Sequence, residues 1–275
     1  MRIVINPAYH NTEAFIKTLP SVFDNQGVMV YEKRNTIKMF DVGGLQLVVK
    51  RFKRPNLVQR IAYTWFRPSK AKRAYLFAER FRRSDIATPH EVAYLECTKW
   101  GLFSDSYFVS ESCSLPSAKD LLADDARLED ASGRGRFQSR PFGHYDREAL
   151  LEAIGSFIAT VHSRGILHGD LNISNILCRE TGATGAGPDR ETDAWHFVLI
   201  DTNRAKFRQP TQGECVDDLK RVSHDRDILL SIVGYYAMAR GWDEEWCRAA
   251  VLRKLCAFER RKECKRRLRW LFHCC

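Results

Sequence analysis

The sequence has no long apolar stretch: no segment approaches the roughly 18 consecutive apolar residues that a membrane-spanning helix needs. The apolar part of its amino-terminal segment is too short for a signal peptide. Nine cysteines are present, but the number is odd and no two form a C-x-x-C pair. This pattern disfavours disulfides or a metal site and favours free thiols in a reducing compartment. We therefore expect a cytoplasmic protein.

Acidic residues are almost absent between Lys50 and Arg83, where twelve Lys or Arg residues accompany the single acid Glu79. A second basic run, from Arg260 to Arg269, contains seven basic residues and one acid. Charge runs are most often solvated surfaces, but two clusters of one sign indicate an anionic partner, such as a phosphate-rich lipid, an acidic membrane or nucleic acid.

Residues 166–177 contain the pattern H-x-D-L-x-x-x-N followed by Ile-Leu. In the catalytic loop of kinases, the Asp of this pattern accepts the proton of the substrate hydroxyl and the Asn holds Mg²⁺. Asp170 and Asn175 occupy these positions. A second apolar segment, 197–200, ends in Asp201, where kinases place their other metal-binding Asp. Alone, the two segments would be an ordinary turn and a strand with a polar end, but together they predict a kinase that uses ATP and Mg²⁺.

The amino-terminal half predicts an antiparallel five-stranded sheet. Runs rich in β-branched and aromatic residues cover 28–31, 36–40, 45–52, 91–96 and 105–111. Lys50 ends an apolar run where kinases place the lysine that binds the α- and β-phosphates. Kinases cover the phosphates with a glycine-rich turn, but the turn at 33–35 has no glycine, so Arg34 and Asn35 are expected to donate instead. Glu111 lies in segment 110–113, whose backbone is expected to contact adenine.

Helical periodicity marks a helix from 69 to 83, whose only carboxylate is Glu79. Glu79 is expected to pair with Lys50, as the corresponding glutamate does in kinases. The alternative is a surface pair with Arg82 or Arg83 on the same helix. An earlier helix is expected from Thr12, ending at Pro20.

The remainder is expected to be mostly helical, with helices over 117–123, 146–164 and 225–240 and loops at 128–145 and 181–188. Asp225 and Asp227 are expected to hold the backbone of the catalytic loop, although helix capping alone would explain either. The predicted fold is therefore α+β, bilobal and protein-kinase-like. Its divisions are an amino-terminal extension (1–27), an amino-terminal lobe (28–112) and a helical carboxy-terminal lobe (113–275).

Five segments together resemble the lipopolysaccharide core (Kdo) kinase family over about residues 28–240. They are K-R-N at 33–35, V-K-R-F-K-R-P at 49–55, T-P-x-x-V-A-Y at 88–94, H-G-D-L-N-x-x-N-I-L at 168–177 and I-D-x-N-R at 200–204. The catalytic-loop pattern alone indicates only the kinase superfamily. The I-D-x-N-R segment stands where many kinases have D-F-G, and it is what points to this family within the superfamily.

The resemblance implies phosphorylation of a sugar hydroxyl, of Kdo or heptose, on lipid A-linked core oligosaccharide at the cytoplasmic face of the inner membrane. It implies that Lys50 binds phosphates, that Asp170 is the base and that Asn175 and Asp201 hold metal. The basic runs would then bind an anionic acceptor and membrane rather than nucleic acid. Two alternatives stay open: an atypical protein Ser/Thr kinase and a non-catalytic kinase-like binding module.

Overall fold

The computed structural model of the chain describes residues 1–129, 145–181 and 194–271, without the side chains of 124–129 and 268–271. The expected loops at 128–145 and 181–188 lie almost wholly outside these residues. The chain divides into two compact units. Unit 1 comprises Met1–Ser114 with Val198–Arg204, and unit 2 comprises Leu115–Phe197 with Ala205–Cys275.

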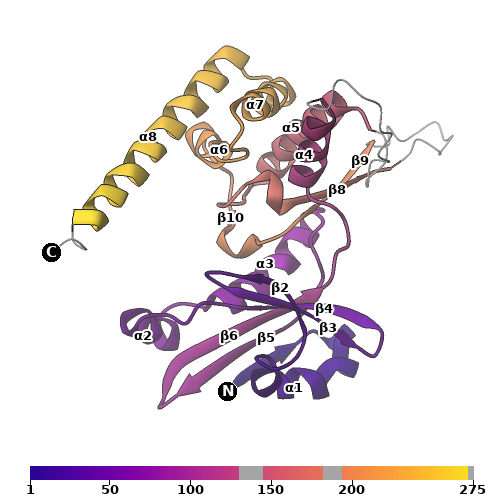
Figure 1. The fold of residues 1–275 in the computed structure, drawn as a ribbon, viewed down its shortest axis with the longest axis vertical. Coiled ribbons are helices and arrows are strands. Elements are labelled where there is room, and N and C mark those ends of the chain that lie inside the picture. The colour runs from indigo at the N-terminus through magenta and orange to yellow at the C-terminus, as the bar shows by residue number, and fades with distance from the viewer. Residues whose placement is uncertain (130–144, 182–193, 272–275) are drawn as a thin grey trace. The chain divides into compact units, whose positions relative to one another are not determined.

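Unit 1 is built on an antiparallel sheet of six strands in the order β1-β5-β6-β4-β3-β2 (Figure 1). The strands are β1 (Arg2–Ile5), β2 (Val28–Glu32), β3 (Thr36–Val42), β4 (Leu45–Arg51), β5 (Glu91–Lys99) and β6 (Leu102–Glu111). The five expected strands are present. The sixth, β1, comes from the amino-terminal segment and pairs with β5, so the expected strand number was one too low.

Alternation along the strands gives the sheet two covered faces. Helix α1 (Glu13–Val22) buries Ile16 and Leu19 against one face, on Val49 and Leu95 among others. Helix α3 (Lys70–Arg83) covers the other, where Ala71 and Ala74 pack with Phe52 and Tyr94. Because Val49 points toward α1, its neighbour Lys50 lies on the α3 face.

Pro20 does not end its helix, contrary to expectation: α1 continues to Val22 and the N–H of Phe23 still bonds to the carbonyl of Leu19. A proline removes only one helical hydrogen bond. Burial of both Leu19 and Phe23 in the unit 1 core offsets that loss.

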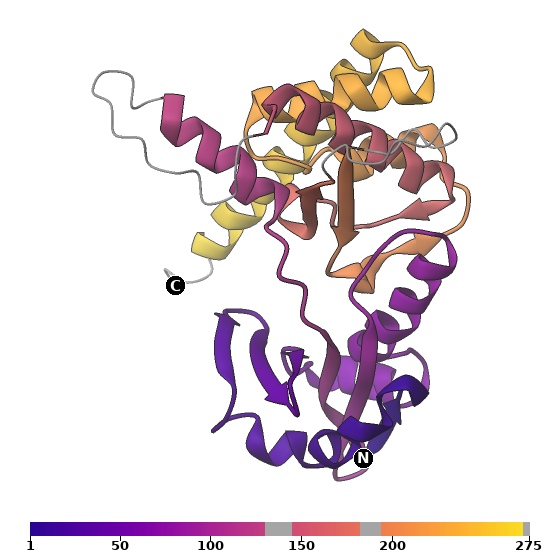
Figure 2. The ribbon, with the colours of Figure 1, turned by 90° about the vertical axis from the view of Figure 1, so that its right-hand side faces the viewer.

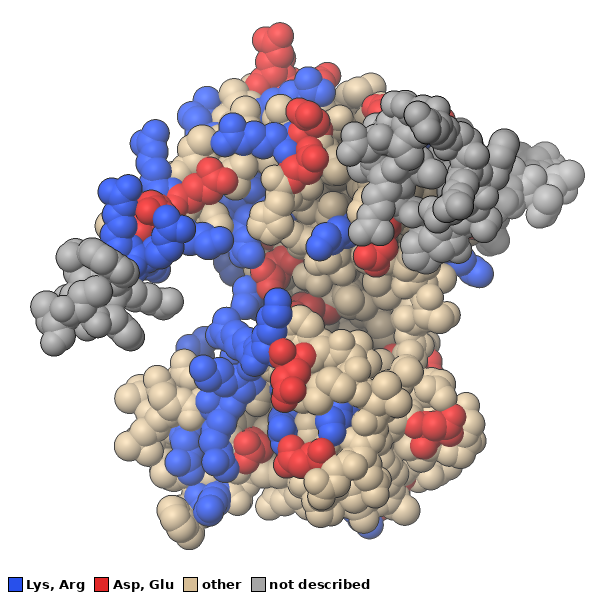
Figure 3. Space-filling model, in the orientation of Figure 1, with Lys and Arg blue, Asp and Glu red and all other residues tan. Residues whose placement is uncertain are grey.

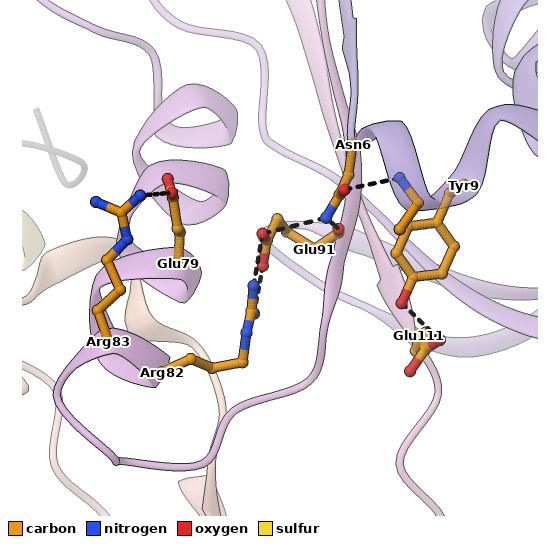
Figure 4. A network of polar contacts seen from close by, with 8 residues as sticks. Asn6, Tyr9, Glu79, Arg82, Arg83, Glu91 and Glu111 are labelled. Atoms are coloured by element: carbon orange, nitrogen blue, oxygen red, sulfur yellow. Dashed lines mark hydrogen bonds and ion pairs between the residues drawn. The ribbon is translucent and has the colours of Figure 1, made fainter.

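A buried polar network ties the amino-terminal residues to the sheet (Figure 4). Glu91 of β5 is almost fully covered and receives two hydrogen bonds from the guanidinium of Arg82 in α3. The side chain of Asn6 donates to the carbonyl of Glu91 at 3.1 Å. A buried carboxylate is stable only when paired and hydrogen-bonded, so these contacts fix β1 and α3 to the same strand.

Unit 2 is mostly helical, as expected. Its helices are α4 (Ala118–Glu129), α5 (Arg147–Ser163), α6 (Gln212–Leu219), α7 (Arg226–Arg240) and α8 (Glu244–Leu271), and its short strands include β7 (Ile166–Leu167), β8 (Ile176–Glu180) and β10 (Lys206–Phe207). β9 (Trp195–Leu199) pairs with β8. Asp146 and Asp225 cap α5 and α7 through hydrogen bonds to backbone N–H groups. None of the helices that the structure describes has both the length and the apolar character needed to cross a bilayer.

Helices α5 and α7 lie side by side in both views of the chain (Figures 1 and 2). Their close approach depends on Gly155. A Cβ atom there would lie 2.7 Å from the Cβ of Tyr235 and 2.8 Å from the backbone nitrogen of Tyr236. Such distances require the two helices to separate.

We therefore expect Gly155→Ala to lower the free energy of unfolding by about 1–3 kcal/mol, although alanine favours helices more than glycine does. Gly213→Ala is the matched control, because Gly213 is helical and its added methyl group would meet open space. Urea denaturation of both variants measures the difference. A Gly155→Ala variant as stable as the control would show that the helix contact tolerates the methyl group.

Candidate active site

Lys50 and Asp201 form the central ion pair of unit 1. The Nζ of Lys50 lies 2.8 Å from Oδ1 of Asp201, and the lysine side chain is only 14% exposed. Asp201 follows β9 in the left-handed backbone conformation, with φ of 58°. Asn203 also donates to the Asp201 carboxylate. Lys50 and Asp201 are 151 positions apart in the sequence, and the fold brings them together.

Glu79 does not take part in this pair. Its carboxylate bonds to Arg83 at 2.6 Å, one helical turn later, while Lys50 bonds to Asp201 (Figure 4 shows the Glu79–Arg83 pair). The expected Lys50–Glu79 pair is therefore not formed in this structure, and the surface pair considered beside it is. The i, i+4 spacing on a helix brings Glu79 and Arg83 together without any tertiary contact.

The turn that carries Arg34 and Asn35 is held in place by Asn35. Its Oδ1 accepts from the backbone N–H of Lys53 at 3.1 Å, and its carbonyl accepts from that of Lys33 at 3.3 Å. Asn35 thus stabilises the turn through its oxygens, which leaves Arg34 as the residue of the pair with the charge to bind phosphate.

Glu111 is held at the end of β6 by contacts within unit 1. Its carboxylate accepts from the hydroxyl of Tyr9 at 2.7 Å, and its backbone N–H donates to His90 at 2.9 Å. Burial and this carboxylate raise the pKa of Tyr9. The N–H of Ser112 donates to Gln46 at 2.8 Å. The N–H groups of Glu111 and Ser112 are therefore engaged, and adenine would have to be contacted by carbonyl groups or by later residues.

The loop with Asp170 and Asn175 lies in unit 2 and is closed by its own side chains. The Nδ2 of Asn175 donates to the backbone carbonyl of Asp170 at 3.0 Å. Asn172 donates to the carbonyl of Arg221 at 3.0 Å and accepts from the N–H of Ser174 at 2.9 Å. The carboxylate of Asp170 lies 3.5 Å from the guanidinium of Arg221. These contacts fix both predicted residues in one short segment.

A residue that sequence reasoning missed, Asp218 of α6, holds the start of this loop. Its two carboxylate oxygens accept from the backbone N–H groups of His168 and Gly169, each at 2.9 Å. We expected this role for Asp225 or Asp227. Asp225 instead caps α7 by accepting from the N–H groups of Asp227 and Ile228. The sequence did contain a signal for this role. Asp218 lies on the side of α6 that carries the apolar residues Cys215 and Leu219, and an acid on a buried helix side needs a partner.

Asp218 also contacts His162 of α5, which is fully buried. The Nε2 of His162 lies 3.4 Å from the carboxylate, and its Nδ1 lies 3.0 Å from the hydroxyl of Tyr236. Burial alone would raise the pKa of Asp218, but the hydrogen bond and charge of His162 outweigh it and lower that pKa. Burial alone would lower the pKa of His162, but the hydrogen bonds and charges of Asp218 and Cys215 together outweigh it and raise that pKa. The two groups thus stabilise each other's charge.

Comparison with known proteins decides the family. The family model of the lipopolysaccharide kinase (Kdo/WaaP) family matches residues 23–242. The chain belongs to this family. The resemblance seen in the sequence is therefore confirmed, and this kinase is a phosphotransferase that acts on a sugar hydroxyl.

One solved structure supports the fold. A structure of WaaP in complex with acyl carrier protein matches with a TM-score of 0.57 at 20% identity, over 93% of this chain and 98% of that chain. A microcompartment-associated aminopropanol kinase matches with a TM-score of 0.43 at 14% identity, over 84% of each chain. No curated protein matches the sequence of this kinase. The likeness to WaaP confirms the expected α+β, protein-kinase-like fold.

The predicted metal ligands of this kinase suit a hard cation. Mg²⁺ prefers oxygen ligands and usually keeps several waters and substrate phosphates in its shell. Asp201 offers a carboxylate, and Asn175 offers its side-chain oxygen because its Nδ2 is bonded to Asp170. Among the described residues, no three His, Cys, Asp or Glu side chains cluster as a metal site.

The Asp218–His162 pair predicts a pH-dependent stability. The raised pKa of His162 gives a contribution that is present below its unfolded value of about 6.5 and is lost as pH rises through the folded value. The lowered pKa of Asp218 gives a contribution to stability that is present above its unfolded pKa of about 3.9 and is lost as pH falls through its pKa in the folded state. Both contributions are therefore present between about pH 4 and 6.5.

We expect Asp218→Asn to lower the free energy of unfolding by about 3 kcal/mol at pH 6, and by less once the pH exceeds the raised pKa of His162 in the folded kinase. Urea denaturation over a pH series from 6 upward measures this. Asp217→Asn is the control, because the Asp217 carboxylate is half exposed and pairs with Lys220 at the surface. A loss that stays the same over the whole pH series would mean that the titration of His162 makes no contribution to it.

Proposed function

We propose that this kinase transfers the γ-phosphoryl group of ATP to a hydroxyl of Kdo or heptose in lipid A-linked core oligosaccharide, at the cytoplasmic face of the inner membrane. The observation that carries the proposal is the Lys50–Asp201 ion pair in a chain of this family. It supports the assignment of both residues to the donor's phosphates and metal. A non-catalytic binding module would have no need of either charge.

Each candidate residue has a role in this reaction. Asp170 accepts the proton of the acceptor hydroxyl, because an ionised carboxylate in the catalytic loop is the base that kinases use. Lys50 binds the donor's α- and β-phosphates, with Arg34 as a further donor from the turn and Glu111 near the adenine. Asn175 and Asp201 would hold Mg²⁺, which neutralises phosphate charge when bound. Lys50 is presented by strand β4, and rigid elements position reacting groups better than loops do.

Unit 1 carries a helix that suits a membrane surface. Helix α2 (Leu57–Trp65) has no buried residue. Its polar side is attached to β6: the Nε of Arg60 donates to the carbonyl of Phe103 at 2.7 Å, and Thr64 accepts from the N–H of Phe103 at 3.0 Å. The apolar side chains are therefore exposed. They are Leu57 (59% exposed), Val58 (75%), Ile61 (39%), Trp65 (64%) and, just after the helix, Phe66 (78%).

Basic residues surround this apolar helix. Lys53, Arg54 and Arg67 flank it in the sequence, and Figure 3 shows a band of Lys and Arg atoms beside the part of the surface where α2 lies. Amphipathic helices with aromatic and aliphatic residues on one side and cations around them bind anionic bilayers. We therefore propose α2 as the contact that holds the kinase at its lipid-linked acceptor, with the basic run of α8 (residues 260–269) as a second contact.

Asp170→Asn and Asp201→Asn should each reduce phosphoryl transfer by at least about 10²-fold, because each removes a positioned base or a metal ligand. The assay incubates purified kinase with ATP, Mg²⁺ and core lipopolysaccharide, with casein as the alternative acceptor. Circular dichroism checks that the variants fold. Phosphorylation of casein alone would favour the protein-kinase alternative, and transfer to neither acceptor would favour the binding module.

Val58→Asp and Phe66→Asp should each weaken sedimentation with anionic liposomes, with little effect on stability because both side chains are exposed. Met238→Asp is the matched control, since Met238 is 64% exposed on α7 in unit 2. Basic residues near an anionic surface contribute about 1 kcal/mol each and are screened by salt. Binding by the wild type should therefore fall as salt rises. Equal binding by all variants would remove α2 from the membrane contact.

A further inference from the structure

Several cations of unit 1 gather around the first turns of α3. Lys70 is the first residue of this helix and Arg73 lies one turn later. Arg204 ends the short helix η3 (Thr202–Arg204), which packs against α3. Arg34 and Lys50 contribute from the adjoining turn and strand. Burial lowers the pKa of Lys70, and the charges of Arg34, Arg204, Arg73 and Lys50 lower it further.

The charges that act most strongly on Lys70 are positive. Burial is also the main cause of the lowered pKa of Arg73, to which the charges of Arg67 and Arg204 add. The Nε of Arg73 is buried and has no hydrogen-bond partner among the described residues. Buried N–H groups are normally satisfied, so this one indicates a ligand that accepts hydrogen bonds.

The backbone adds to the positive field at the same place. Helix α3 begins at Lys70 behind the cap Ser69, whose hydroxyl accepts from the N–H of Lys72 at 3.1 Å. The first turn of a helix carries partial positive charge and N–H groups that favour anions. Together with the cationic side chains, it provides the elements of a phosphate site.

We propose that Lys70 and Arg73 bind a phosphate group of the acceptor, separate from the phosphates of ATP; this inference rests on the proposed function. The charge of Lys50 is already matched by Asp201, and the metal that accompanies ATP neutralises much of the donor's charge. The donor therefore does not require two further cations. A phosphate monoester carries about −1.5 to −2 charges, which matches the charges of Lys70 and Arg73.

The first experiment separates acceptor from donor. Lys70→Met and Arg73→Gln should each raise the KM for phosphorylated core lipopolysaccharide about ten-fold and leave the KM for ATP within about two-fold. Arg80→Gln is the matched control, because Arg80 lies on the exposed side of the same helix. With an acceptor freed of its phosphates, wild type and variants should have the same KM. A rise in the KM for ATP alone, or no change in either KM, would overturn the proposal.

The second experiment detects the site without turnover, so its failure is distinct from a failure of the proposed function. Because its pKa is lowered, Lys70 should react faster than Lys72 with an amine-reactive reagent at neutral pH. The intact kinase is labelled and then digested, and mass spectrometry of the peptides measures the labelling of each lysine. Inorganic phosphate should protect Lys70, and the protection should be lost in Arg73→Gln but retained in Arg80→Gln. Lack of protection by phosphate in the wild type would overturn the anion site itself.

Discussion

The buried carboxylate of Asp218 is the contact on which the catalytic segment depends. It binds two consecutive N–H groups at the start of the loop that carries Asp170 and Asn175, and it contacts His162, which in turn contacts Tyr236. Loop, α5, α6 and α7 are thus linked through one side chain. A buried carboxylate without partners would be costly, so each contact also stabilises the anion itself. The same group therefore orders the loop and connects the helices of unit 2.

Elements with a strong local pattern were predictable from the sequence. The spacing of apolar residues predicted α3, α5 and α7, and in the structure Ser69, Asp146 and Asp225 cap these helices. Lys50 was identified because it ends a β-branched run, and strand alternation then places it on the α3 face. The catalytic-loop spacing predicted Asp170 and Asn175 as site residues, because the two are only five positions apart. In the structure the side chain of Asn175 donates a hydrogen bond to the backbone carbonyl of Asp170.

Features that depend on tertiary contacts were not predictable in this way. The partner of Glu79 was decided by a competition between a distant lysine and an arginine one turn away. The strand β1 is only four residues long and exists because β5 offers it an edge. The role of Asp218 required knowledge of which helix meets the loop. Helix α2 lacked a buried side, so the periodicity that marks core-facing helices gave no signal for it.

The left-handed backbone at Asp201 restricts which amino acids can occupy this position. Only glycine, and to a lesser degree asparagine and aspartate, adopts that conformation at low cost. The ion pair with Lys50 needs a negative charge, which glycine and asparagine lack. Aspartate alone satisfies both requirements, and glutamate, which would keep the charge, does not suit the backbone. Any substitution at this position would therefore disturb either the left-handed backbone of the turn or the ion pair with Lys50.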